Sequence, residues 1–274
     1  MPATRLRTHR VAKPWGRQKL WPGFADAADG ELIGEIWFQT EGDEVPELLV
    51  KYLFTSEKLS IQVHPDDTRA RAAGYPRGKD EVWVILDAEP EATIALGLKA
   101  PTTRDHLRQS ALDGSIEQLV DWKPVKAGEV IYSAAGTVHA IGAGLTLIEV
   151  QQNVDLTYRL YDYGRPRELH LDAGIAVSDP VPFTPSQVTR DAGDGRTILT
   201  EGPKFVLERW QDGTHSLALG AIPALLIPVV GGGTVDGQRW TAGECWSVTG
   251  DTRVVLDAGA DVLFAYPGGD VVPA

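Results

Sequence analysis

With 274 residues, 43% of them hydrophobic and 23% charged, the chain is large enough for one sizeable domain or two smaller ones and has the composition of a soluble globular protein. Its 26 Lys and Arg residues against 38 Asp and Glu residues give a formal net charge of −12 at pH 7. A surface this acidic argues against a nucleic acid or an anionic membrane as a partner, and an anionic substrate would need a local basic pocket.

The N-terminal segment contains no apolar run that resembles the core of a signal peptide, and no part of the chain approaches the ~18 apolar residues of a membrane span. A cytoplasmic location is therefore expected. The pattern that follows is typical of short strands separated by Gly and Pro. Strands are predicted for ELLVKYLF (47–54), LSIQV (59–63), EVWVIL (81–86), ATIALGL (92–98), EVIYS (129–133) and LTLIEVQQ (145–152).

Helical patterns are few. The segment PDDTRARAAG (65–74) predicts one short helix that ends at Gly74, because glycine readily takes the left-handed conformation that closes a helix. Two more helices are predicted within 102–122, separated at Gly114, with Ser115 and Gln118 at the spacing of a capping box.

The segment from about 180 to 200 is rich in Pro, Gly and Asp and is predicted to be a linker. Beyond it, short strands are again predicted for KFVLERW, ALLIPVV, GTVDGQRW, ECWSV and RVVLDA. This C-terminal part contains Cys245, the sole cysteine of the chain, so neither an internal disulfide nor a cysteine-based zinc site can form. We therefore predict an all-β protein of two barrels or sandwiches, with small helices in the first.

Gln62 and His64 lie two residues apart in LSIQVHPDD, so a strand would place both side chains on one face, opposite Ile61 and Val63. An inward-facing amide and imidazole are costly to bury unless something satisfies them, and a metal ion would do so. A hydrogen-bonded core histidine is the alternative for a histidine considered alone. In GKDEVWVIL (78–86), Glu81 begins a strand and shares a face with Trp83.

The segment GEVIYSAAGTVHAIG (128–142) resembles the second cupin motif, in which a glycine-bounded hairpin delivers one metal-binding histidine, here His139, to the mouth of a barrel. The first cupin motif is echoed by Gln62, His64 and Glu81, with Gln in place of the first His and a longer gap before the Glu.

Four segments occur in one order: LSIQVHPDD, KDEVW, GTVHAIG and EVQQNVDLTYRLYDYGRPRELH. Together, over roughly residues 10 to 175, they resemble the type I mannose-6-phosphate isomerases (phosphomannose isomerases) of the cupin superfamily, in their short bacterial form. The resemblance implies two cupin (jelly-roll) barrels. These are expected to be a catalytic metal-binding domain at 1–180 with a helical insertion at about 100–122, and a barrel at 200–274. The second is expected to be metal-free, because His215 has no partner at ligand spacing there.

The resemblance also implies the activity, a zinc-dependent interconversion of mannose 6-phosphate and fructose 6-phosphate through a cis-enediol. It implies one Zn²⁺ per chain, and an imidazole and carboxylate set with an open position is typical of catalytic zinc. The residues that match the family's ligands are Gln62, His64, Glu81 and His139.

The catalytic residues implied in the same way are Arg159, Lys79 and Asp155. A lysine near Zn²⁺ would have its pKa lowered, which suits a base, and an arginine can stabilise enediolate charge. With no glycine-rich phosphate loop in the chain, the phosphate must be met by side chains, for which Ser60, Arg165 and Lys51 are the candidates. Each of these residues could instead be plain surface.

Two other classes stay open at this point. One is another cupin enzyme, using Fe²⁺ or Mn²⁺ or acting on a different phosphosugar, because two His and a carboxylate also hold non-haem iron. The other is a non-catalytic sugar-binding cupin, against which the proton-transfer groups argue. The sequence leaves open the oligomeric state, the metal loaded, the base, the substrate range and the pathway served.

Overall fold

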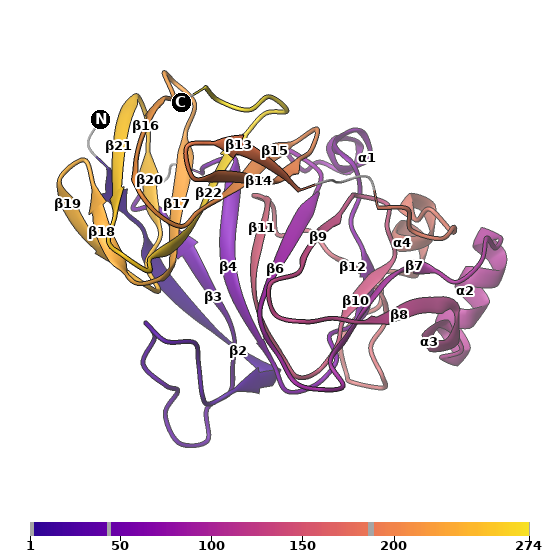
Figure 1. Cartoon of the computed structure of the whole chain (residues 1–274). Helices are drawn as coiled ribbons and strands as arrows, with labels where there is room; N and C mark the ends of the chain where they lie inside the picture. Colours follow the sequence, from indigo (N-terminus) through magenta and orange to yellow (C-terminus); the bar gives the residue numbers. More distant parts are fainter. Residues whose placement is uncertain (1–2, 43–44, 186–188, 274) are drawn as a thin grey trace.

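The computed structural model describes residues 3–42, 45–185 and 189–273 (Figure 1). Its strands form four sheets in which every strand pairing is antiparallel, and the prediction of an all-β fold is confirmed. Within the described residues, no helix is both long enough and apolar enough to cross a membrane.

Two sheets are built from the first two thirds of the chain. The six-stranded sheet has the order β2 (Arg7–Arg17), β3 (Ile33–Gln39), β4 (Leu48–Thr55), β11 (Leu145–Gln152), β6 (Glu81–Ala88), β9 (Val130–Ser133). The five-stranded sheet has the order β12 (Tyr158–Tyr161), β5 (Ile61–Val63), β10 (His139–Ile141), β7 (Thr93–Leu98), β8 (Val120–Pro124).

The other two sheets are built mainly from the C-terminal third. The seven-stranded sheet has the order β1 (Thr4–Arg5), β20 (Trp246–Val248), β17 (Ala224–Val230), β22 (Asp261–Pro267), β15 (Phe205–Trp210), β14 (Arg196–Glu201), β13 (Arg190–Gly193). The four-stranded sheet has the order β16 (Thr214–Ala218), β21 (Asp251–Leu256), β18 (Gly232–Val235), β19 (Gln238–Thr241).

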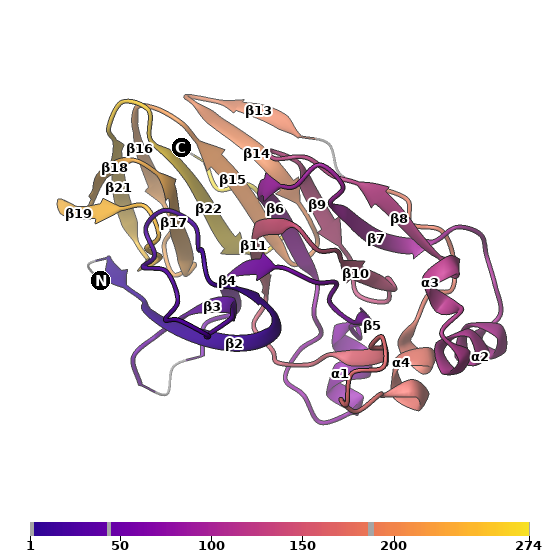
Figure 2. The same ribbon diagram turned by 90° about the horizontal axis from the view of Figure 1, so that it is seen from below.

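Four short helices complete the described part of the chain, α1 (Asp67–Ala72), α2 (Arg104–Asp113), α3 (Ile116–Leu119) and α4 (Leu171–Val177). Helices α2, α3 and α4 gather at the end of the molecule that lies away from the C-terminal sheets (Figures 1 and 2). They cover the outer face of the five-stranded sheet, since residues of α2, α3 and α4 share an apolar cluster with residues of β5, β7 and β12.

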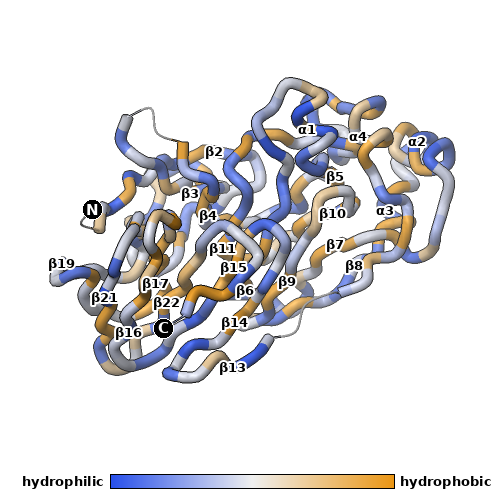
Figure 3. Tube along the Cα trace, turned by 90° about the horizontal axis from the view of Figure 1, so that it is seen from above, coloured by the Kyte–Doolittle hydropathy of each residue, from blue (hydrophilic) through white to orange (hydrophobic). Residues whose placement is uncertain are grey.

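The alternation of side chains on β4 explains how the sheets stack. Val50, Tyr52 and Phe54 point outward and join an apolar cluster with residues of the seven-stranded sheet such as Phe205. Leu53 points to the other face and packs with residues of the five-stranded sheet. All eight residues of β4 are buried, because the six-stranded sheet lies between two others, and Figure 3 shows apolar residues along these central strands.

The predicted helices at 65–74 and 102–122 are confirmed, and Gly74 and Gly114 take the positive φ expected of residues that end a helix. The capping box is wrong: Ser115 is itself in helical conformation and its side chain makes no capping hydrogen bond. Helix α4 was not predicted. Its Gly174 disfavours a helix by propensity but fits closely against Leu160, where a Cβ would lie 2.6 Å from a side-chain carbon.

The linker predicted at about 180–200 is wrong over its second half. Strands β13 and β14 form a hairpin there, and its turn places Gly193, Asp194 and Gly195 at positive φ. Gly and Asp favour such a turn, so the Gly and Asp residues that suggested a linker instead form the turn of a hairpin. Residues 186–188 of the predicted linker lie outside the described residues.

Candidate active site

Three buried side chains from three different strands or strand ends meet between the six-stranded and five-stranded sheets. His64 follows β5, His139 begins β10 and Glu81 begins β6. Strand β5 pairs with β10 so that Gln62 lies opposite His139, which brings the two histidine-bearing segments together. The sequence-predicted residues His64, Glu81 and His139 are each at most 1% exposed, and their ligand atoms lie within 4.8 Å of one another.

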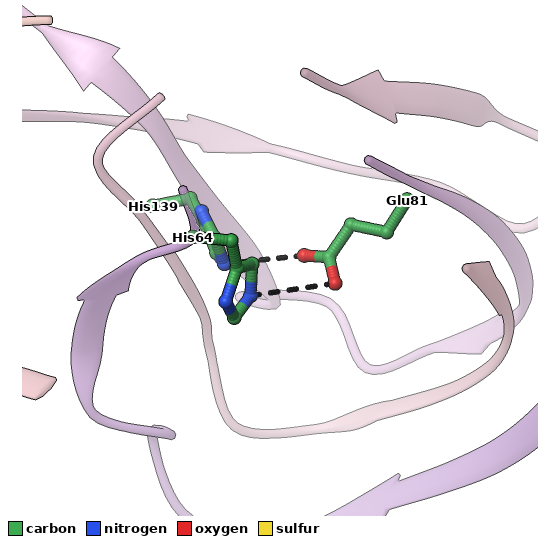
Figure 4. Close-up of side chains that lie close together, drawn as sticks. All are labelled: His64, Glu81 and His139. Carbon is green, nitrogen blue, oxygen red and sulfur yellow. Dashed lines mark ion pairs between the residues drawn. The ribbon is translucent and has the colours of Figure 1, made fainter. Parts of the chain in front are cut away.

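Both imidazoles face the two oxygens of the Glu81 carboxylate (Figure 4). His139 Nε2 lies 3.1 Å from Oε1 and His64 Nε2 lies 3.5 Å from Oε2. The other ring nitrogens lie close to backbone carbonyls: His64 Nδ1 is 2.8 Å from the oxygen of Leu156, and His139 Nδ1 is 2.9 Å from that of Thr137. A carbonyl only accepts hydrogen bonds, so each Nδ1 carries the hydrogen and each Nε2 presents a lone pair.

This arrangement of donors fits a metal ion. Neither oxygen of Glu81 has a hydrogen-bond partner of regular geometry within the described part of the chain, although Lys79 Nζ lies 3.0 Å from Oε2. Lys79 neutralises only the Oε2 side, and the lone pair of His139 Nε2, 3.1 Å from Oε1, repels the carboxylate unless a further cation lies between them. Burial and the neighbouring Lys79 lower the pKa of His64 to about 3, so its imidazole is neutral, as a metal ligand must be.

The carboxyl group of Glu81 is charged despite its position. Burial raises the pKa of Glu81, but the charge of Lys79 and the two nearby imidazoles outweigh burial and hold this pKa well below its usual value. The site therefore offers one carboxylate and two imidazoles, a donor set typical of catalytic zinc and of other divalent transition metals.

Gln62 lies beside this cluster and not inside it. Its amide nitrogen is 3.3 Å from His139 Nε2, and its amide oxygen accepts a hydrogen bond from Ser60 at 3.2 Å. Offering an oxygen to a metal would require the amide to turn over, which exchanges two groups of nearly equal size.

Lys79 is buried at the edge of the cluster. Its Nζ lies 3.0 Å from Glu81 Oε2, 3.3 Å from His64 Nε2 and 3.9 Å from Glu149 Oε1. Burial lowers the pKa of Lys79, but the carboxylates of Glu149 and Glu81 outweigh burial and raise this pKa above its usual value. The expectation of a lowered pKa considered only the charge of a metal and did not include these carboxylates.

Glu149 was missed from the sequence. It lies on β11, is 4% exposed and binds Lys51 Nζ at 3.1 Å, and it accepts a hydrogen bond from Trp83 Nε1 at 3.2 Å. The signal was present, because a carboxylate in the middle of LTLIEVQQ shares a face with Leu147 and Gln151 and therefore points inward. Trp83 is a core residue, and its ring also packs edge-on against His139.

A cavity of about 310 Å³ opens above the cluster. Six of the sequence-predicted residues line it: Lys51, Ser60, Gln62, Lys79, Asp155 and Arg159. The three buried residues do not line this cavity themselves. Gln62 and Lys79 do, and these two side chains contact His139 and His64, so the cavity adjoins the cluster through them.

Arg159 reaches the cavity from β12, opposite Gln62 on the neighbouring strand. Burial and the positive charge of Arg167, which also lines the cavity, lower the pKa of Arg159. Two guanidinium groups close together at a cavity wall indicate an anion-binding site. Asp155 is exposed and lies on an irregular segment before β12. It therefore reaches the cavity that Arg159 also lines from a loop and not from a strand.

Among the predicted catalytic and phosphate-binding residues, Arg165 is the one that does not line the cavity. Its guanidinium donates to Asp162 at 2.7 Å and to the backbone oxygen of Lys58 at 2.9 Å. His170 also lines the cavity, and its Nδ1 accepts a hydrogen bond from the backbone of Arg159 at 3.2 Å.

The fold and the site together define an all-β protein with a candidate metal centre beneath a polar, cation-lined cavity. No protein-family profile matches the chain. It is 35% identical over 268 residues to mannose-6-phosphate isomerase of Streptococcus mutans, covering 83% of this chain and 84% of the relative. It is 38% identical over 225 residues to mannose-6-phosphate isomerase of Bacillus subtilis, covering 78% and 70%.

The chain therefore belongs to the mannose-6-phosphate isomerase family and is an aldose–ketose isomerase. Among solved structures, the crystal structure of a mannose 6-phosphate isomerase from Bacillus subtilis matches with a TM-score of 0.84 at 24% identity, over 97% of this chain and 99% of the other. A zinc-bound mannose 6-phosphate isomerase matches with a TM-score of 0.72 at 15% identity, over 98% and 100%. At these identities the structural matches speak for the fold alone.

Proposed function

We propose that this protein interconverts mannose 6-phosphate and fructose 6-phosphate through a cis-enediol, with one Zn²⁺ per chain held by His64, Glu81, His139 and Gln62. The observation that carries the proposal is the buried His–Glu–His cluster, whose imidazole nitrogens face a carboxylate without a regular hydrogen-bond partner beneath a cavity lined by cations. When bound, Zn²⁺ supplies positive charge that favours developing negative charge on nearby oxygens.

The isomerisation needs a group that moves one proton between carbon atoms. The proton leaves C2 of the aldose and arrives at C1 of the ketose, while a hydroxyl proton passes from the C2 oxygen to the C1 oxygen. Lys79 and Asp155 are the ionisable candidates for this transfer, because both line the cavity. The raised pKa of Lys79 makes it a proton-holding group in the resting protein, whereas Asp155 is exposed at the cavity.

The charge that develops on the enediolate needs a fixed cation. Arg159 is suited to this role, because its backbone is held on β12 by pairing with Gln62 and its guanidinium donates to the backbone oxygen of Glu168 at 2.8 Å. One nitrogen of this guanidinium, Nε, is buried with no hydrogen-bond partner among the described residues, and a substrate oxygen would satisfy it.

The phosphate is bound by side chains in this proposal. Ser60 and Lys51 line the cavity, although Lys51 is already engaged by Glu149 and Gln151. Arg165 does not line the cavity, so we assign phosphate binding to Arg167, which lines it. Both arginines pair with Asp162. The sheets that carry this site and the C-terminal sheets are proposed to be the two cupin domains of the family.

The test uses the purified protein with mannose 6-phosphate and detection of the ketose. Conversion should be lost on chelation and restored by Zn²⁺, and elemental analysis should find about one equivalent per chain. His64→Ala combined with His139→Ala should abolish both metal binding and conversion. Full metal occupancy in that double variant would contradict the site, and sugar binding without conversion by the native protein would support the non-catalytic alternative.

A further inference from the structure

The three residues that lead into Glu81 are fixed from both sides. Gly78, Lys79 and Asp80 form an irregular segment directly before β6. Lys79 N donates to the oxygen of Pro65 at 3.0 Å, and a Cβ on Gly78 would lie 2.4 Å from the backbone of Asp66. The segment is therefore pressed onto the loop that follows His64, which leaves little freedom for Lys79.

Asp67 and Gln152 hold this segment by hydrogen bonds. Asp67 Oδ1 accepts the amide of Gly78 at 2.8 Å and the side-chain amide of Gln152 at 3.1 Å. Gln152 Oε1 in turn accepts the amide of Asp80 at 3.0 Å. Both amides that flank Lys79 thus depend on where the Asp67 carboxylate lies.

The carboxylate of Asp67 is held in place from the C-terminal part of the chain. Lys204, immediately before β15, donates from Nζ to Asp67 Oδ2 at 2.6 Å, and its own carbonyl accepts the amide of Gly268 at 3.0 Å. The other cation near this carboxylate is Arg71 on α1, at 3.7 Å and largely exposed, so it is the weaker partner.

A second contact, from Phe205 next to Lys204, supports the other end of residues 78–80. The hydroxyl of Tyr132 donates to the Asp80 carboxylate, and the Tyr132 ring lies 5.7 Å, centroid to centroid, from the ring of Phe205, the first residue of β15. The start of β15 therefore supports residues 78–80 at both ends, through Asp67 and through Tyr132.

We propose that Lys204 is a positioning residue for the isomerase reaction, which acts through Asp67 to hold Lys79 and Glu81 in place. The C-terminal sheets then support the geometry of the site in addition to covering apolar surface. The inference rests on the proposed function for its kinetic part. Outer partners of a metal site commonly affect its activity by about 10- to 100-fold, because small displacements of the reacting groups lower the rate.

The kinetic test compares Lys204→Met with Arg209→Met in the full-length, zinc-saturated protein. Arg209 lies on β15, the strand that follows Lys204, and pairs with Asp261, and its side chain is 30% exposed against 29% for Lys204, but it has no contact with residues 78–80. Lys204→Met should lower kcat about tenfold while KM changes by less than about twofold. Lys204→Arg should recover most of the rate, and Arg209→Met should leave it unchanged.

A readout that does not need catalysis separates this inference from the proposed function. Hydrogen exchange of the amides at 78–80 should be faster in Lys204→Met than in the native protein, and unchanged in Arg209→Met. Combining Lys204→Met with Asp67→Asn should cost no more than the larger single change, because both act through one contact. Native exchange and native kcat in Lys204→Met would overturn the inference, as would equal losses in Lys204→Met and Arg209→Met.

Discussion

Replacing Lys79 by methionine should make the stability of the protein depend on zinc more strongly than it does in the native chain. Lys79→Met removes the ammonium group that lies 3.0 Å from Glu81 Oε2 and leaves that buried carboxylate facing the imidazoles of His64 and His139. A metal ion among these groups supplies the missing positive charge. The substitution should therefore be costly in the chelated protein and much less costly in the zinc-loaded protein.

The size of the effect follows from the burial of the charges. Removing one partner of a buried ion pair costs about 3–5 kcal/mol, and we expect about 3 kcal/mol here, because Glu149 keeps Lys51 at 3.1 Å. For a chain of this size that corresponds to a fall in Tm of about 6–12 °C. With saturating Zn²⁺ the fall should shrink to less than half of this value.

Thermal unfolding with chelator and with Zn²⁺ measures both values. Lys51→Met is the matched control: Lys51 is 7% exposed against 5% for Lys79 and also pairs with Glu149, but it has no contact with Glu81. Its cost should be the same with and without zinc. A loss for Lys79→Met that is equal in the two conditions would show that no metal neutralises Glu81.

Four further outcomes are expected. Arg159→Ala should lower kcat by about 10²–10³ with a smaller change in KM, because the enediolate charge develops only in the transition state, and native kcat in the folded variant would exclude that role. Arg167→Ala should raise KM for mannose 6-phosphate more than Arg165→Ala does. A larger increase in KM for Arg165→Ala would show that Arg165, and not Arg167, binds the phosphate. The chelated protein should lose thermal stability as the pH falls from 6.5 toward about 3. The pKa of His64 is about 3 in the folded protein and near 6.5 in the unfolded chain, so between these values only the unfolded chain binds the extra proton. His64→Gln should make the stability depend less steeply on pH in this range. Deleting 200–274 should expose the apolar face of the six-stranded sheet and cause aggregation, which a soluble and active shortened chain would contradict.

The period of two along strands was enough to predict the inward-facing residues of the site. Gln62 on β5 and Glu81 on β6 lie on the faces that alternation gives them, and His139, singled out by the hairpin motif, lies opposite Gln62 at the start of β10. The same rule applied to β11 would have identified Glu149. It was overlooked because the strand otherwise reads as an apolar core segment.

What the sequence could not show depends on contacts between distant segments. Nothing in the local pattern distinguishes Arg165 from Arg167, since both lie in one irregular segment and only the position of Asp162 and Lys58 decides which reaches the cavity. The link from Lys204 to Asp67 joins residues 137 positions apart. The helix at 171–177 forms despite its glycine, because tertiary packing against β12 outweighs propensity.

The central claim is that the site moves a proton between C1 and C2 of a phosphosugar. The most direct measurement is NMR of mannose 6-phosphate incubated with the zinc-loaded protein in deuterated water. An enzyme base exchanges its proton with solvent during the enediol's lifetime, so fructose 6-phosphate should appear with deuterium at C1, and recovered mannose 6-phosphate should carry deuterium at C2. Absence of the ketose would contradict the proposed activity, and unlabelled ketose would contradict proton transfer and indicate a hydride shift.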